Sequence, residues 1–114
     1  MSVPVTRTSD GKRMHLLLQS LPLGPGRRNV GIYFKALDND DDDIWSSPEK
    51  LASDWDGPFR VTELGSAYST MVLQPDSSIG FLYEESTHFK SWIAYTIVYK
   101  KLSVEEITGG RYRN

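Results

Sequence analysis

The chain has 114 residues, of which 39% are hydrophobic and 11% aromatic, enough for a packed core in one small domain or in part of a larger one. Its formal net charge of −2 gives nucleic acid little electrostatic attraction, and the absence of cysteine excludes disulfides and thiolate metal sites. No apolar run approaches the length of a membrane span, and Met1–Gly11 lacks the apolar core of a signal peptide. We therefore expect either a cytoplasmic protein or one whose upstream part carries the signal.

The first half of the chain predicts three strands. Arg13–Gln19 and Asn29–Leu37 are apolar stretches bounded by polar residues, and the loop Leu21–Gly26 between them is rich in proline and glycine. Their spacing suggests an antiparallel pair. A long connection over residues 46–57 then leads to a shorter strand, Phe59–Leu64.

The second half repeats this pattern. Tyr68–Gln74 and Ile79–Glu84 predict a hairpin, because Pro75–Ser78 between them has the composition of a turn. After a polar loop, Tyr95–Leu102 predicts a further strand. The two groups of about three strands form a weak internal repeat with a period near that of a propeller blade. A self-contained small β-sandwich or meander fits the same strand count.

Two serines predict short helical turns. Ser47 precedes Pro48 and has the features of an N-cap with proline in the first turn. Ser103 is followed three residues later by Glu106, which predicts a weak capping box. The last residues, 108–114, are expected to form a frayed tail.

The acidic run Asp38–Asp43, together with Glu49, has the ligand spacing of an EF-hand calcium loop. Asp43 stands where that loop requires glycine, and no amphipathic helices flank the run, so we expect no dedicated calcium site. His15 and His88 have no partner at metal or triad spacing. The sequence therefore predicts no metal centre and no cofactor.

The segment Ala67–Glu85 starts with Tyr68-Ser69 at the beginning of a strand, continues through the turn Pro75-Asp76-Ser77, and ends in a strand that contains Gly80–Glu84. In order and spacing it resembles the last blade of bacterial and animal sialidases. That family has a Tyr-Ser pair, a turn such as Pro-Asp-Gly, and a strand of the form Gly-x-Leu-Tyr-Glu. The resemblance extends over residues 11–107.

Two further segments match the family. Tyr95–Tyr99 resembles the strand that follows, and Trp45–Pro48 resembles a Trp-Ser-x-Pro segment that precedes the last blade. Asp40 and Trp45 have the separation found in the Asp-box, a hairpin motif of sialidase propellers in which tryptophan packs between hairpins. Other residues replace the serine and glycine of that motif, so the box is degenerate.

The resemblance implies an all-β fold made of about two blades from the C-terminal end of a six-bladed β-propeller, with antiparallel sheets. Residues 11–64 would form the penultimate blade, residues 65–107 the last blade, and residues 108–114 the tail. A propeller of this kind needs about 50 residues per blade. The chain is therefore expected to require an N-terminal remainder as its partner, because two isolated blades would leave apolar faces in water.

The resemblance also implies that Tyr68 is the catalytic nucleophile. A sialic acid carries a carboxylate on its anomeric carbon, so a neutral phenol avoids the like-charge repulsion that a carboxylate nucleophile would meet. The phenol needs a base, which the family supplies as a glutamate from an earlier blade. Glu84 and Glu85 are adjacent on a strand and point to opposite faces, so they are poor candidates for joint acid–base work.

Arg27 matches the third of three family arginines that bind the substrate carboxylate, because Arg27-Arg28-Asn29 precedes an apolar strand as Arg-x-Asn. The planar guanidinium can bind a carboxylate through two hydrogen bonds. Arg28 is the alternative if the alignment shifts by one residue. A pair of solvated loop cations is the purely structural interpretation.

The implied activity is that of an exo-α-sialidase, which hydrolyses terminal sialic acids from glycoconjugates with retention. The acid–base aspartate, the glutamate partner of Tyr68 and two of the three arginines would lie in the N-terminal remainder, so the chain alone is expected to be inactive. The full-length protein would be periplasmic or secreted. The alternatives are a non-catalytic carbohydrate-binding or assembly module, and a free-standing β-domain that oligomerises through its edge strands.

Overall fold

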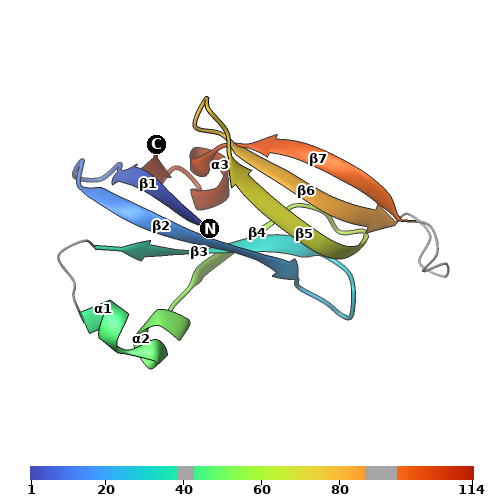
Figure 1. Ribbon diagram of the computed structural model, residues 1–114, viewed down its shortest axis with the longest axis horizontal. Coiled ribbons are helices and arrows are strands. Elements are labelled where there is room, and N and C mark those ends of the chain that lie inside the picture. Colours follow the sequence, from blue (N-terminus) through green and yellow to red (C-terminus); the bar gives the residue numbers. More distant parts are fainter. Residues whose placement is uncertain (39–42, 87–94) are drawn as a thin grey trace.

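The computed structural model describes residues 1–38, 43–86 and 95–114, except for the side chains of residues 43 and 45. These residues form two antiparallel sheets and three short helices (Figure 1). The strands are β1 (Ser2–Arg7), β2 (Arg13–Pro22), β3 (Val30–Leu37), β4 (Asp56–Arg60), β5 (Gly65–Leu73), β6 (Ile79–Ser86), β7 (Thr96–Leu102) and β8 (Tyr112–Arg113). The helices are α1 (Asp43–Ser46), α2 (Pro48–Ala52) and α3 (Val104–Thr108). The expectation of an all-β architecture is confirmed.

The larger sheet has the strand order β4-β3-β2-β1-β8, in which β1 to β4 follow one another as a meander. Leu16 in β2 lies opposite Val3 of β1 on one side and Ala36 of β3 on the other. The smaller sheet has the order β5-β6-β7, with Phe81 at its centre opposite Met71 of β5. The two hairpins expected from the sequence, β2–β3 and β5–β6, are both confirmed.

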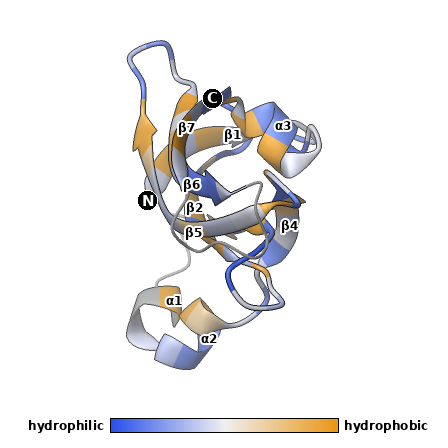
Figure 2. Cartoon of the chain, turned by 90° about the vertical axis from the view of Figure 1, so that its right-hand side faces the viewer, coloured by the Kyte–Doolittle hydropathy of each residue, from blue (hydrophilic) through white to orange (hydrophobic). Residues whose placement is uncertain are grey.

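One apolar core lies between the two sheets. Alternate side chains of β1, β2 and β3 point into it from the larger sheet, as the period of two along a strand requires. Helix α3 adds three buried residues, Val104, Ile107 and Thr108, and hydrophobic colour marks part of α3 (Figure 2). The buried cluster consists of Val3, Val5, Met14, Leu16, Leu18, Val30, Ile32, Phe34, Ile79, Phe81, Tyr83, Leu102, Val104, Ile107 and Tyr112.

The structure has two strands, β1 and β8, that the sequence does not predict. Pro4 lies in β1, and proline is rare in sheet interiors, but its neighbours Val3 and Val5 are both buried in the core. The tail predicted to fray instead forms β8, in which Tyr112 is buried and lies opposite Arg7 of β1. In both cases burial of apolar side chains outweighs the local signal.

The strand expected at residues 59–64 begins and ends earlier, as β4 (Asp56–Arg60). It separates from β3 after Arg60, because the amides of Val61 and Thr62 both donate to the carbonyl of Val30, at 2.9 and 3.4 Å. The next strand, β5, starts at Gly65 rather than at Tyr68.

Both predicted helix caps are confirmed. Ser47 Oγ accepts a hydrogen bond from the amide of Lys50 at 3.4 Å. Ser103 Oγ accepts from the amide of Glu106 at 3.0 Å, while the Ser103 amide donates to Glu106 Oε2 at 2.8 Å, which completes the capping box.

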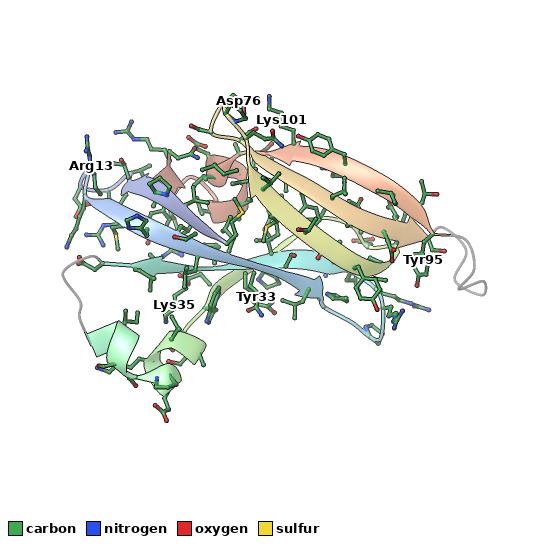
Figure 3. The ribbon with its side chains drawn as sticks, in the orientation of Figure 1. Arg13, Tyr33, Lys35, Asp76, Tyr95 and Lys101 are labelled. Carbon is green, nitrogen blue, oxygen red and sulfur yellow. The ribbon has the colours of Figure 1, made fainter. Side chains whose placement is uncertain are left out.

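Helices α1 and α2 lie on the face of the larger sheet that points away from the smaller sheet (Figure 1). Lys35 of β3 points toward them and donates to the carbonyl of Ser53, just after α2 (Figure 3). The lysine stem is thereby buried under the helices, and its ammonium group is hydrogen-bonded.

Adjacent positions on β6 test which face of the smaller sheet is buried. Phe81→Ala is expected to lower the free energy of unfolding by about 3–5 kcal/mol, because the side chain is fully buried in the core. Leu82→Ala, with its side chain on the opposite face and 41% exposed, is expected to cost less than about 1.5 kcal/mol. Urea unfolding followed by circular dichroism measures both, and equal losses would contradict this arrangement.

Candidate functional site

Tyr68 lies near the start of β5, with its side chain 73% exposed. Ser66 of β5 lies opposite Glu85 of β6, whereas Ser69 lies opposite Tyr83, so β5 has one residue more than β6 between these two pairs. Such an extra residue is a β-bulge, which changes the direction of nearby side chains and is frequent beside active sites. The bulge is the local feature that presents the Tyr68 ring to solvent.

Arg27 lies in the exposed loop between β2 and β3. Its guanidinium carbon is 5.9 Å from the centre of the Tyr68 ring, a distance typical of a cation–π contact. The backbone of this loop is attached to β5, because the amide of Ser66 donates to the carbonyl of Arg27 at 2.8 Å. The structure thus brings together the two side chains that the sequence selects as nucleophile and carboxylate ligand.

Arg28, the alternative carboxylate ligand, has its backbone opposite Gly65 in an isolated antiparallel bridge. Its carbonyl accepts a hydrogen bond from the amide of Gly24 at 3.1 Å. Arg28 therefore contributes to the attachment of the loop, whereas the guanidinium of Arg27 lies over Tyr68.

A shallow pocket of about 200 Å³ opens beside Tyr68, at the end of the smaller sheet where Tyr95 also lies (Figure 3). All three strands of the sheet line it, and most of its surface is apolar. The lining residues are Tyr68, Ser69, Thr70, Leu82, Tyr83, Glu84 and Ile97. Such a pocket offers an apolar wall beside the exposed Tyr68 phenol and the Glu84 carboxylate.

Glu84 and Glu85 have different surroundings. Glu84 lines the pocket beside Tyr68. The carboxylate of Glu85 accepts hydrogen bonds from Thr62 Oγ1 at 2.9 Å and from the hydroxyl of Tyr83 at 3.1 Å. These contacts agree with the sequence argument that the two carboxylates serve opposite faces of the strand.

The pocket belongs to a larger apolar surface, which we call the outer face: the side of the smaller sheet that points away from the core. Leu82 lies at its centre, opposite Thr70 of β5 and Tyr99 of β7. Ile97 is 70% exposed on the same face, and Val72 is also exposed. Several large apolar side chains grouped on one face are unusual for a surface that stays in water.

At one end of the outer face, Asp76 in the β5–β6 turn forms an ion pair with Lys101 of β7 (Figure 3). The ammonium group and two hydrogen bonds from Ser78 hold the pKa of the Asp76 carboxyl well below its usual range. The turn predicted at residues 75–78 is thereby fixed to the strand on the far side of the sheet.

Two parts of the site carry no recognisable sequence signal. Ser66 is fully buried, and its Oγ accepts a hydrogen bond from the amide of Val30 at 3.0 Å, which joins the two sheets beside Tyr68. The β-bulge depends on the register between β5 and β6. A serine near the start of a strand predicts neither the hydrogen bond to Val30 nor the bulge.

His15 is exposed in β2, and Asp38 pairs with Lys12. Asp40 and His88 lie outside the described residues, as does the side chain of Trp45, so the interpretations based on them remain predictions. Within residues 1–38, 43–86 and 95–114, no three His, Asp or Glu side chains are grouped so as to hold a metal ion. No described helix is long and apolar enough to cross a membrane.

Comparison with protein-family models and with curated proteins finds no match for this chain.

The buried phenol of Tyr83 gives a pH-dependent prediction. Burial, followed by the charge of the Glu85 carboxylate that accepts a hydrogen bond from its hydroxyl, raises the pKa of Tyr83 to about 12. In the unfolded chain this phenol ionises near pH 10, as an ordinary tyrosine does. Between about pH 10 and about pH 12 the unfolded state therefore binds fewer protons, and the free energy of unfolding should fall as the pH rises.

Urea unfolding of the wild type and of Tyr83→Phe across this range provides the measurement. The variant should lose part of the pH dependence, while Tyr99→Phe, whose ring is exposed on the outer face, should keep it. An unchanged slope in Tyr83→Phe would contradict the raised pKa.

Proposed function

We propose that this chain is the C-terminal portion of an exo-α-sialidase, which removes terminal sialic acids from glycoconjugates with retention. The observation that carries the proposal is the position of the Arg27 guanidinium over the ring of Tyr68, at the edge of an apolar pocket. A sialic acid presents its carboxylate on the carbon that is attacked. A carboxylate-binding arginine next to the nucleophile is therefore the arrangement that this reaction requires.

In the proposed reaction the Tyr68 oxygen forms a bond to the anomeric carbon as its proton passes to a glutamate base. The bond to the aglycone breaks, and an aspartic acid protonates the departing oxygen. Water then attacks the anomeric carbon as one of its protons passes to the same aspartate, the bond to the Tyr68 oxygen breaks, and the phenolate takes its proton back from the glutamic acid. The proposal assigns both the aspartate and the glutamate to the N-terminal remainder.

We further propose that the two sheets are neighbouring propeller blades, over residues 11–64 and 65–107. The meander of β1 to β4 has the strand number of a blade, with β1 added before residue 11. The exposed side chains of Val72, Leu82 and Ile97 support a further blade on the outer face, because each blade buries its faces against its neighbours. The full-length protein is proposed to be periplasmic or secreted.

The same outer face supports a second candidate function, a non-catalytic assembly or carbohydrate-binding module. Such a module would use the exposed apolar side chains for contact with a partner, and Arg27 and Tyr68 would have no chemical role. The two candidates differ in the effect of changes at those two residues.

The first test is hydrolysis of a fluorogenic sialoside by the chain with and without its N-terminal remainder. The complemented protein is expected to turn over, and Tyr68→Phe should lower the rate by several orders of magnitude, because the phenyl ring has no oxygen to attack with. Tyr99→Phe, which removes a hydroxyl elsewhere on the same sheet, should retain the rate.

Normal turnover by the complemented Tyr68→Phe variant would defeat the assignment of the nucleophile. Turnover by the 114-residue chain alone would contradict the proposal that the chain is only a portion of the enzyme.

The second test separates the two candidate functions through Arg27. In the complemented protein Arg27→Ala is expected to weaken binding of N-acetylneuraminic acid by about tenfold to a hundredfold, the range for losing a charge-assisted hydrogen bond. Arg28→Ala is the parallel variant, because Arg28 is the alternative carboxylate ligand on the same loop. Titration calorimetry measures both, and an unchanged affinity in both variants would favour the assembly module.

A further inference from the structure

The loop that carries Arg27 is closed by Asn29. The side-chain amide of Asn29 donates to the carbonyl of Gly24 at 2.6 Å, across the base of the loop. The carbonyl of Asn29 accepts from the amide of Leu23 at 2.8 Å, so side chain and backbone of one residue tie both ends of the loop together. Arg27 lies within the segment that these bonds enclose.

Asn29 also has an unusual backbone conformation, with φ of 57°. This left-handed region is costly for most residues but is adopted several-fold more often by asparagine. The chain needs this conformation where it leaves the loop and enters β3. Asn29 therefore combines the backbone turn and the side-chain donor in one half-buried residue.

A second set of bonds fixes where the loop lies relative to Tyr68. The backbone amide of Asn29 donates to the carbonyl of Leu64 at 3.2 Å, and the backbone amide of Ser66 donates to the carbonyl of Arg27 at 2.8 Å. These bonds are made by the backbone and would survive a change of the Asn29 side chain. They attach the base of the loop to β5, whereas the side-chain bond to Gly24 sets the shape of the loop above it.

We propose that Asn29 is a positioning residue, whose side-chain hydrogen bond to Gly24 holds the loop in the shape that keeps Arg27 over Tyr68. The long side chain of Arg27 is exposed, and holding such a chain in one place costs conformational entropy. A closed loop lowers that cost because it restricts the backbone before any ligand arrives. That the positioned Arg27 binds the carboxylate of a sugar rests on the proposed function. The contact between Arg27 and Tyr68 does not depend on that function.

The contact can be followed directly by NMR in the 114-residue chain. In the wild type, the δ-methylene protons of Arg27 are expected to show nuclear Overhauser effects to the Tyr68 ring and an upfield shift caused by it. Tyr68→Leu supplies the baseline without a ring. Asn29→Asp keeps the shape of the side chain and the preference for the left-handed region, but replaces the donor with an oxygen that repels the Gly24 carbonyl.

In Asn29→Asp the Overhauser effects to Tyr68 should disappear and the δ-methylene shift should move to the Tyr68→Leu baseline. Signals of the buried Phe81 and Tyr83 rings should stay in place. Asn29→Gly removes the same donor at no backbone cost, so it provides the same test if the aspartate variant does not fold. Ser77→Gly, at another left-handed position in the β5–β6 turn, should leave the contact intact.

An unchanged Arg27 shift with intact Overhauser effects in either Asn29 variant would overturn the inference, and so would their absence in the wild type. Sialoside hydrolysis by the complemented protein is a separate measurement. If Asn29→Asp loses the contact but the complemented wild type does not bind or hydrolyse a sialoside, the positioning role stands and the sialidase proposal fails. If the complemented protein is active and Asn29→Asp keeps the contact, only the positioning role fails.

Discussion

The smaller sheet has one face in water and one face in the core, and the arrangement of the rest of the molecule follows from this. Phe81 and Tyr83 of β6 are buried against the larger sheet, so Leu82 between them and Glu84 after Tyr83 point outward. The core therefore determines which residues can line the pocket beside Tyr68. A shift of one residue in the register of β6 would exchange the two sets.

The site itself depends on short connections between the two sheets rather than on the core. Ser66 accepts a hydrogen bond from the amide of Val30, and the Arg27 carbonyl accepts one from the amide of Ser66. Beyond the bulge, the hydroxyls of Ser20 and Ser69 are 2.7 Å apart. These polar contacts lie at the margin of an apolar interface, where each buried hydrogen-bonding group needs a partner. They fix β5 against the larger sheet on both sides of Tyr68.

Much of the fold follows from local patterns. Alternation and turn composition predict the β2–β3 and β5–β6 hairpins, and serine with a following glutamate predicts the cap of α3, because these signals act within a few residues. β1 and β8 are absent from that prediction, since Pro4 argues against a strand and Tyr112 is buried only through contacts distant in sequence. For the site, only the resemblance to sialidases selects Tyr68 and Arg27, and their contact depends on the packing of two sheets, which local pattern does not specify.

The position of Tyr68 on the outer face has a consequence for regulation. Under the proposed function, the surface that a neighbouring blade would cover also forms the wall of the pocket, through Leu82 and Ile97. Assembly and catalysis would then be linked. The folded chain alone would hold only part of the active site, and activity would appear only when the N-terminal remainder docks.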